Sequence, residues 1–167
     1  MRSDGFTFLE LIITLAVAAI LLLVGIPGLQ HLLAESALQT EVFSLHNALH
    51  RARSQAIDHQ TDVIVCLADK QEQCVKQGFT HLLLFVDQDQ DRKLSASQNG
   101  DTILLRHALP GTALTITTNQ LHFVFQPDGT QAGTPGTMTL CGSGMSEGIG
   151  IAIAMSGRVR QQKISCS

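Results

Sequence analysis

Apolar residues are concentrated in the first fifth of the chain. Between Phe6 and Ala34 the only formally charged side chain is Glu10, and residues 11–29 are a run of 19 positions without any charge. An apolar helix of about 20 residues is long enough to cross the hydrocarbon core of a bilayer. We therefore expect residues 6–29 to form a transmembrane helix.

A narrower apolar stripe continues the helical pattern beyond this run. Its members recur at alternating spacings of four and three residues: Leu38, Val42, Leu45, Leu49, Ala52 and Ala56. The polar residues at other angles are Glu35, Glu41, Asn47, Arg51 and Arg53. This pattern predicts that residues 30–60 are the amphipathic half of the same helix, ending near Asp58. Pro27, between Gly25 and Gly28, predicts a kink or local melting.

From Thr61 onward the period changes to alternating or short β-branched runs separated by turn residues. The predicted strands cover residues 62–67, 79–86, 102–107, 113–118, 121–126, 137–141, 149–155 and 158–165. Asn119–Gln120 and Ser156–Gly157 are expected to be hairpin turns, the second with a positive φ at Gly157. The fold class is thus α+β, with a long N-terminal helix and a β-rich head over residues 61–167.

Glu10 is the unusual feature of the apolar run, because a carboxylate one turn into such a helix is costly unless a cation neutralises it. If the chain were cut after Gly5, the new ammonium group of Phe6 would lie at i,i+4 spacing from Glu10. An ordinary secretory signal would have a basic leader and a small-x-small cleavage site. An uncleaved signal anchor with a chance glutamate is the alternative.

The segment Gly5-Phe6-Thr7-Phe8-Leu9-Glu10, followed by Leu-Ile-Ile-Thr-Leu-Ala-Val, resembles the class III leader of type IV pilins and type II secretion pseudopilins. This resemblance implies that a prepilin peptidase removes residues 1–5 and that Phe6 is N-methylated. It also implies that Glu10 registers the subunit against a neighbour's amino terminus, with the helix of residues 6–29 first in the inner membrane and then in a filament core. The partners would be other pilins, and the head would be periplasmic before assembly and extracellular afterwards.

The rest of the chain resembles the FimT/GspH family of minor type IV pilins and pseudopilins, most closely the DNA-binding FimT type. The features that carry this resemblance are the Cys66–Cys74 loop, Phe85-Val86-Asp87, the turn at residues 125–129, Ser156-Gly157-Arg158-Val159-Arg160 and a terminal cysteine. The resemblance implies a type IV pilin-like fold, in which the helix packs on an antiparallel sheet.

Four cysteines follow the membrane-directed segment, which favours disulfides in an oxidising compartment. They permit three pairings. We favour Cys66 with Cys74, which closes a short loop, and Cys141 with Cys166, which pins the tail to a neighbouring strand. No CxxC pair is present, so the spacing argues against a metal–thiolate site.

Asp87, Asp89 and Asp91 imitate the opening of an EF-hand calcium loop, but Arg92 replaces the required glycine and Gln98 stands where the bidentate glutamate should be. We therefore predict no metal and leave cation binding by these aspartates open.

Two other motifs point away from catalysis. His46 and His50 share a helix face without the glutamate of a zinc protease. Residues 144–148 fit G-x-S-x-G, but an apolar strand-like segment follows where a nucleophile elbow needs a helix. We expect no enzyme activity and no cofactor.

The formal net charge is −3 and the chain has no Trp or Tyr, which excludes a globally basic nucleic-acid binder with stacking platforms. The 20 residues after Glu147 nevertheless contain Arg158, Arg160 and Lys163 and no acid. Along a strand Arg158 and Arg160 would lie on one face about 7 Å apart, close to the spacing of successive phosphates on one DNA strand.

Gly157-Arg158-Val159-Arg160 is similar to the GRxR pattern of FimT-type minor pilins. That resemblance implies DNA contacts by Arg158 and Arg160, with Gly157 in the motif and Lys163 added from its charge. The predicted function is DNA uptake in natural transformation, with little sequence preference. The alternative is a minor pseudopilin with a structural role in a type II secretion pseudopilus or pilus tip, whose basic tail only solvates an edge strand.

Overall fold

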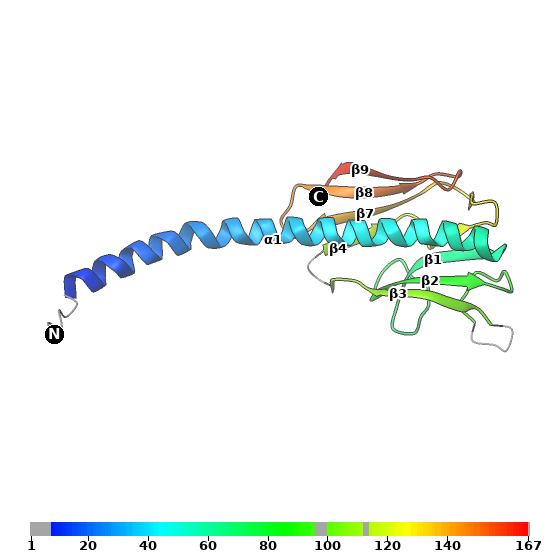
Figure 1. Cartoon of the computed structure of the whole chain (residues 1–167), viewed down its shortest axis with the longest axis horizontal. Coiled ribbons are helices and arrows are strands. Elements are labelled where there is room, and N and C mark those ends of the chain that lie inside the picture. Colours follow the sequence, from blue (N-terminus) through cyan, green and yellow to red (C-terminus); the bar gives the residue numbers. More distant parts are fainter. Residues whose placement is uncertain (1–7, 96–99, 112–113, 167) are drawn as a thin grey trace. The chain divides into compact units, whose positions relative to one another are not determined.

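The structure is a computed structural model that describes residues 8–95, 100–111 and 114–166. Within these residues one helix, α1 (Phe8–His59), is followed by nine strands (Figure 1). The strands are β1 (Asp62–Ala68), β2 (His81–Asp87), β3 (Thr102–Ala108), β4 (Leu114–Thr118), β5 (His122–Phe125), β6 (Gln131–Ala132), β7 (Gly136–Gly142), β8 (Glu147–Ile153) and β9 (Val159–Ser165). The chain divides into two compact units, one ending at Ser36 and one beginning at Ala37.

The described part of the first unit, residues 8–36, is helical. Its 18-residue window of highest mean hydropathy, 2.8, has none of its residues buried within the structure, and its length and composition suit a membrane span. The helix continues without interruption through residues 25–28, so the predicted local melting at Pro27 is wrong. Proline removes only one backbone hydrogen bond, and the helical residues on both sides hold the segment in register. The predicted start at Phe6 lies outside the described residues.

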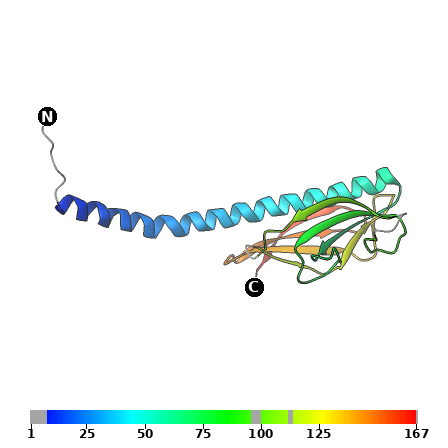
Figure 2. The same cartoon turned by 90° about the horizontal axis from the view of Figure 1, so that it is seen from below.

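In the second unit, the remainder of α1 packs on the strands, as Figure 2 shows from below. The whole predicted stripe is buried: Leu38, Val42, Leu45, Leu49, Ala52 and Ala56. Glu41, predicted on the polar face, is also buried, with 7% of its surface exposed. Its Oε1 lies 2.9 Å from His107 Nε2 of β3, so a partner distant in the sequence allows the carboxylate to enter the interior.

The strands form two antiparallel sheets with the orders β3-β2-β1-β5-β6 and β4-β7-β8-β9. The α+β class and the antiparallel pairing are therefore confirmed. The hairpin predicted at Asn119–Gln120 is wrong, because β4 and β5 belong to different sheets. Asn119 instead binds β7: its Oδ1 accepts a hydrogen bond from the Thr137 amide at 2.8 Å, and its own amide donates to the Thr137 carbonyl.

β1 is apolar on both faces because both are covered. Val63, Val65 and Leu67 join the main core with α1, whereas Ile64 and Cys66 join a second cluster with Leu94 and Cys74. Both β1 and β2 are therefore buried along almost their whole length. β6 was not predicted, because two residues are too few to establish a period.

Candidate nucleic-acid interface

The C-terminal basic residues lie on or beside β9, an edge strand of the second sheet. Among the strands that the structure describes, β9 pairs only with β8, from Glu147↔Ser165 to Ile153↔Val159. The turn between the two strands is closed by hydrogen bonds from the Ala154 amide to the Arg158 carbonyl and from the Gly157 amide to the Ala154 carbonyl. The predicted hairpin is thus present, and it places Arg158 directly before β9.

Gly157 is required by the backbone of this turn. Its φ is 72°, as the sequence predicted, in the left-handed region that favours glycine. A Cβ atom there would collide with the carbonyl oxygen of Gly129 and lie 3.1 Å from Arg53 Nε. Arg53 Nε itself donates a 2.8 Å hydrogen bond to the Gly129 carbonyl. Gly157 therefore fixes the position of the arginines, and Arg53, which the sequence placed on the helix's polar side, supports the neighbouring turn.

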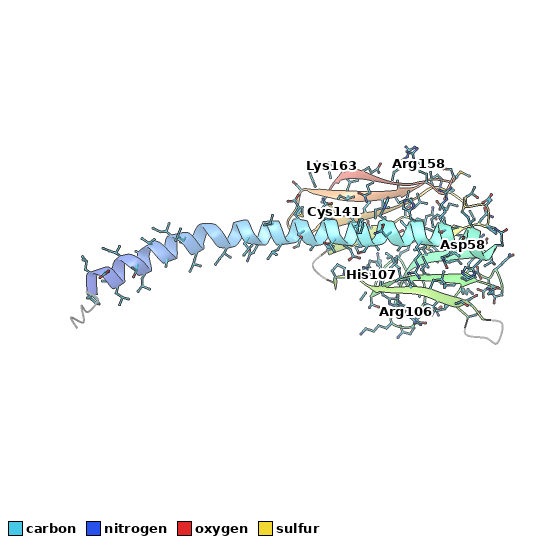
Figure 3. All side chains as sticks on the ribbon, in the orientation of Figure 1. Asp58, Arg106, His107, Cys141, Arg158 and Lys163 are labelled. Carbon is cyan, nitrogen blue, oxygen red and sulfur yellow. A yellow bond between two sulfur atoms is a disulfide. The ribbon has the colours of Figure 1, made fainter. Side chains whose placement is uncertain are left out.

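Arg158 and Arg160 are both exposed. Val159 between them is buried in the core opposite Ile153, so Arg160 lies on the outer face of the sheet with its partner Ala152. Among the described residues, no carboxylate oxygen lies within 4.0 Å of either guanidinium group. Figure 3 shows the Arg158 side chain directed away from the head. Both guanidinium groups are thus available to an anion.

Lys163 does not share this face. Lys163 is paired with Ile149, which lies on the same face of β8 as the core residue Ile151. Lys163 is therefore on the core side of β9, whereas Arg160 is on the outer side. Lys163 Nζ lies 3.7 Å from Glu147 Oε2, and both side chains are largely exposed. The charge count grouped Lys163 with the arginines, but its odd spacing from Arg160 separates it from them.

The outer face that carries Arg160 is otherwise neutral. Across the four strands of this sheet, which the structure describes in full, it consists of small or uncharged residues: Thr115, Thr117, Thr137, Thr139, Cys141, Gly148, Gly150, Ala152, Gln162 and Ile164. A hollow of about 630 Å³ adjoins it, lined by residues that include Thr115, Thr117, Thr139 and Ile164. No carboxylate on this face opposes the approach of a polyanion.

Four basic residues on or beside the other sheet do not extend this face. Arg106 lies on β3 of the other sheet and is paired with Glu72 at 2.5 Å. Lys76 Nζ donates to the Asn119 carbonyl at 2.9 Å. Arg92 and Lys93 follow β2, again in the other sheet. Figure 3 shows Arg106 and Arg158 on different sheets.

Both favoured disulfides are present in the structure. Cys66 is joined to Cys74 and Cys141 to Cys166, with Cα–Cα distances of 5.6 and 5.9 Å. The second bridge connects β7 with the end of β9 and passes over β8. A Cβ atom at Gly148 would lie 2.9 Å from Cys141 Sγ, which explains why a glycine lies beneath the bridge. The bridge holds the far end of the arginine-bearing strand.

The other candidate residues occupy positions of different kinds. Glu10 is exposed in the first turn of α1, and Gly5 and Phe6 lie outside the described residues. The G-x-S-x-G segment covers the end of the connection between the antiparallel strands β7 and β8 and the first two residues of β8. This is not the strand-to-helix turn of a nucleophile elbow. The rings of His46 and His50 are 4.6 Å apart.

Comparison with known families gives two matches. Residues 41–157 match the family described as type II transport protein GspH. Residues 1–26 match the prokaryotic N-terminal methylation motif. No curated protein sequence matches the chain.

Comparison with solved structures gives one minor pilin, in two crystal forms, and one minor pseudopilin. The type IV minor pilin FimU of Pseudomonas aeruginosa, in one crystal form, is 24% identical over 75% of this chain and 92% of that chain, with a TM-score of 0.53. In a second crystal form, FimU is 22% identical over 77% of this chain and 90% of that chain, with a TM-score of 0.56. The minor pseudopilin EpsH from the type 2 secretion system of Vibrio cholerae is 14% identical over 75% of this chain and 95% of that chain, with a TM-score of 0.49. The likeness to FimU establishes the fold.

Proposed function

The chain belongs to the GspH family of type II transport proteins, and from that premise we propose that it is a minor type IV pilin that binds extracellular DNA through Arg158 and Arg160. The proposed role is DNA uptake in natural transformation, as a binding protein and not as an enzyme. A minor pseudopilin with a structural role in a secretion pseudopilus or pilus tip is the alternative within the same family.

The observation that carries the proposal is the pair of exposed arginines without carboxylate partners among the described residues. Guanidinium groups bind phosphate oxygens through two parallel hydrogen bonds. Two residues along an extended chain separate the arginines by about 7 Å, which suits successive phosphates of one strand. Each subunit would therefore contact about two phosphates.

The neutral outer face supports a binding mode without sequence preference. Its threonines and glycines are too short to enter a groove and read base edges. None of its residues is aromatic, so it offers no platform on which bases stack. Affinity would come from phosphate contacts and would be modest for one subunit and larger for several subunits in a filament.

The N-terminal segment supports delivery of the head to the cell exterior. We infer that a prepilin peptidase removes residues 1–5, that Phe6 is then N-methylated, and that Glu10 registers the subunit against another pilin. The methylation-motif match over residues 1–26 and the apolar helix found among the described residues support this sequence of events. The subunit would be held in the inner membrane by residues 6–29 before it enters the filament.

The proposal is tested by fluorescence anisotropy of a labelled DNA duplex titrated with the full chain in non-ionic detergent micelles. For wild type, a plot of the logarithm of the binding constant against the logarithm of the salt concentration is expected to have a slope of about −2, because two phosphates are contacted. Arg158→Gln/Arg160→Gln is expected to weaken binding at least about tenfold at low salt and to bring the slope toward zero.

A matched control removes the same charge elsewhere. Arg51→Gln/Lys70→Gln changes two exposed basic residues outside β9 and should leave the affinity within about twofold of wild type. Equal loss in both double variants would show that only net charge matters and would reject the site. Absence of wild-type binding at low salt would favour the structural pseudopilin role.

A further inference from the structure

Three carboxylates converge where β2 ends and β3 begins, in the sheet that does not carry the arginines. Asp87 is the last residue of β2, Asp89 follows it in the connection, and Asp101 directly precedes β3. One carboxylate oxygen from each of the three lies within 4.8 Å of the others. Like charges at such distances repel each other unless a cation lies between them.

Asp87 is the member of this group that demands an explanation, because its side chain is fully buried. Its Oδ2 accepts a hydrogen bond from the Arg92 amide at 3.1 Å. Its Oδ1 is also buried and has no hydrogen-bond partner within the described structure. A buried carboxylate oxygen without a donor is costly, and bound cations are one of the few groups that satisfy it.

The described surroundings supply oxygen atoms and backbone amides, including those of Gln88 and Ser95, which donate to Asp101, but no positive side chain in contact. In the described part of the chain, no Lys, Arg or His nitrogen lies within 4.0 Å of these carboxylates. The Ser95 hydroxyl lies 3.2 Å from Oδ2 of both Asp89 and Asp101 and donates to these carboxylates, so its oxygen is a fourth oxygen atom beside the group.

We propose that Asp87, Asp89 and Asp101 bind a calcium ion, with Ser95 Oγ and water as further oxygen ligands. Calcium takes six to eight oxygen ligands in flexible geometry, and three carboxylates would neutralise its charge and leave one negative charge. Sites in extracellular modules bind calcium with Kd between about 10⁻⁴ and 10⁻³ M, a range that suits a partly exposed site. This inference does not depend on the DNA-binding proposal.

The proposal revises the prediction of no metal. The sequence argument rested on Arg92 in place of a glycine, but Arg92 has a φ of 62°, the conformation that a glycine would adopt there. It also rested on Gln98, which lies outside the described residues. Asp101, three positions beyond Gln98, supplies the third carboxylate. The sequence spacing did not reveal Asp101, because this residue reaches Asp87 only where the chain returns into β3.

The test is a calcium titration of the full chain in non-ionic detergent, followed by calorimetry and by thermal unfolding with circular dichroism. Calcium at millimolar concentration is expected to release or absorb heat with one site per chain and to raise the Tm by several degrees relative to EDTA. Asp89→Asn and Asp101→Asn should each weaken binding at least about tenfold. Asp69→Asn, which removes a half-buried charge just beyond the other end of β1, should bind calcium as wild type does, because Asn Oδ1 can still accept the hydrogen bonds from the Gln71 and Gln73 amides.

A second variant separates binding from folding. In EDTA, Asp87→Asn is expected to melt at or above the wild-type Tm, because it removes a buried charge that lies beside two other carboxylates. In calcium it should melt below wild type. No heat and no Tm shift in the wild type would overturn the proposal, as would an undiminished calcium response in Asp89→Asn and Asp101→Asn. An equal response to magnesium would overturn the assignment to calcium.

Discussion

A single glycine sets the geometry on which the proposed DNA site depends. Gly157 combines a φ of 72° with a contact to the Gly129 carbonyl that leaves no room for a Cβ atom. Gly157→Ala is therefore expected to reduce the free energy of unfolding by at least about 2 kcal/mol, through backbone strain and displacement of the neighbouring turn. Urea unfolding followed by circular dichroism measures this change.

Gly144 provides the matched control at the same scale. Its φ of 74° is nearly identical, but a Cβ atom there would meet nothing within 4 Å. Gly144→Ala should therefore lower the free energy of unfolding by only about 1 kcal/mol, the cost of the left-handed backbone conformation itself. Equal losses for the two variants would show that the close approach of the Gly129 carbonyl contributes nothing.

At the scale of the element, β9 is held at both ends by different means. The Gly157 turn fixes its start, and the Cys141–Cys166 disulfide fixes its end across β8. The bridge closes a loop with a sequence separation of 25, so Cys141→Ser/Cys166→Ser is expected to lower the stability by about 3 kcal/mol. Because β9 has only one neighbouring strand, its amides should lose hydrogen-exchange protection before those of β8.

The other disulfide separates this local effect from general destabilisation. Cys66→Ser/Cys74→Ser removes a bridge in the other sheet and should leave the protection of β9 relative to β8 unchanged. If the hydrogen-exchange protection of β9 relative to β8 fell in both double variants, the Cys141–Cys166 bridge would have no special role in β9.

At the scale of the whole molecule, the two units differ in the surface that their described residues present. The first is an apolar helix whose exposed side chains suit lipid, and the second has its own core and two disulfides. If the first unit is processed as proposed, mass spectrometry of the chain from its own host should find Phe6 as the methylated first residue. Glu10→Gln should be processed normally but be depleted from sheared filaments, because it loses its charge pairing.

Thr14→Ala is the control for this prediction, because it changes a polar side chain one turn further along the same helix. It should enter filaments as wild type does. Recovery of mature chains that still begin at Met1, or normal assembly of Glu10→Gln, would contradict the proposed processing or the proposed role of Glu10.

Local patterns determined much of this protein. The helical period of the stripe from Leu38 to Ala56 correctly identified the buried face of α1, because a helix repeats its own faces wherever it packs. Eight of the strands were predicted within a few residues, because alternation and turn residues act over short distances. The segment that matches the methylation motif and the GRxR segment are likewise contiguous in the sequence, so both could be identified without a fold.

Only the tertiary structure decided which distant residues meet. It separated β4 from β5 into different sheets and buried Glu41 against His107. It set Lys163 apart from Arg160 through the β8 register, and it brought Asp101 to Asp87. Each of these outcomes depends on pairing between segments far apart in the chain. A local period determines which face of an element is apolar, but the element that covers that face is selected only when the whole core packs.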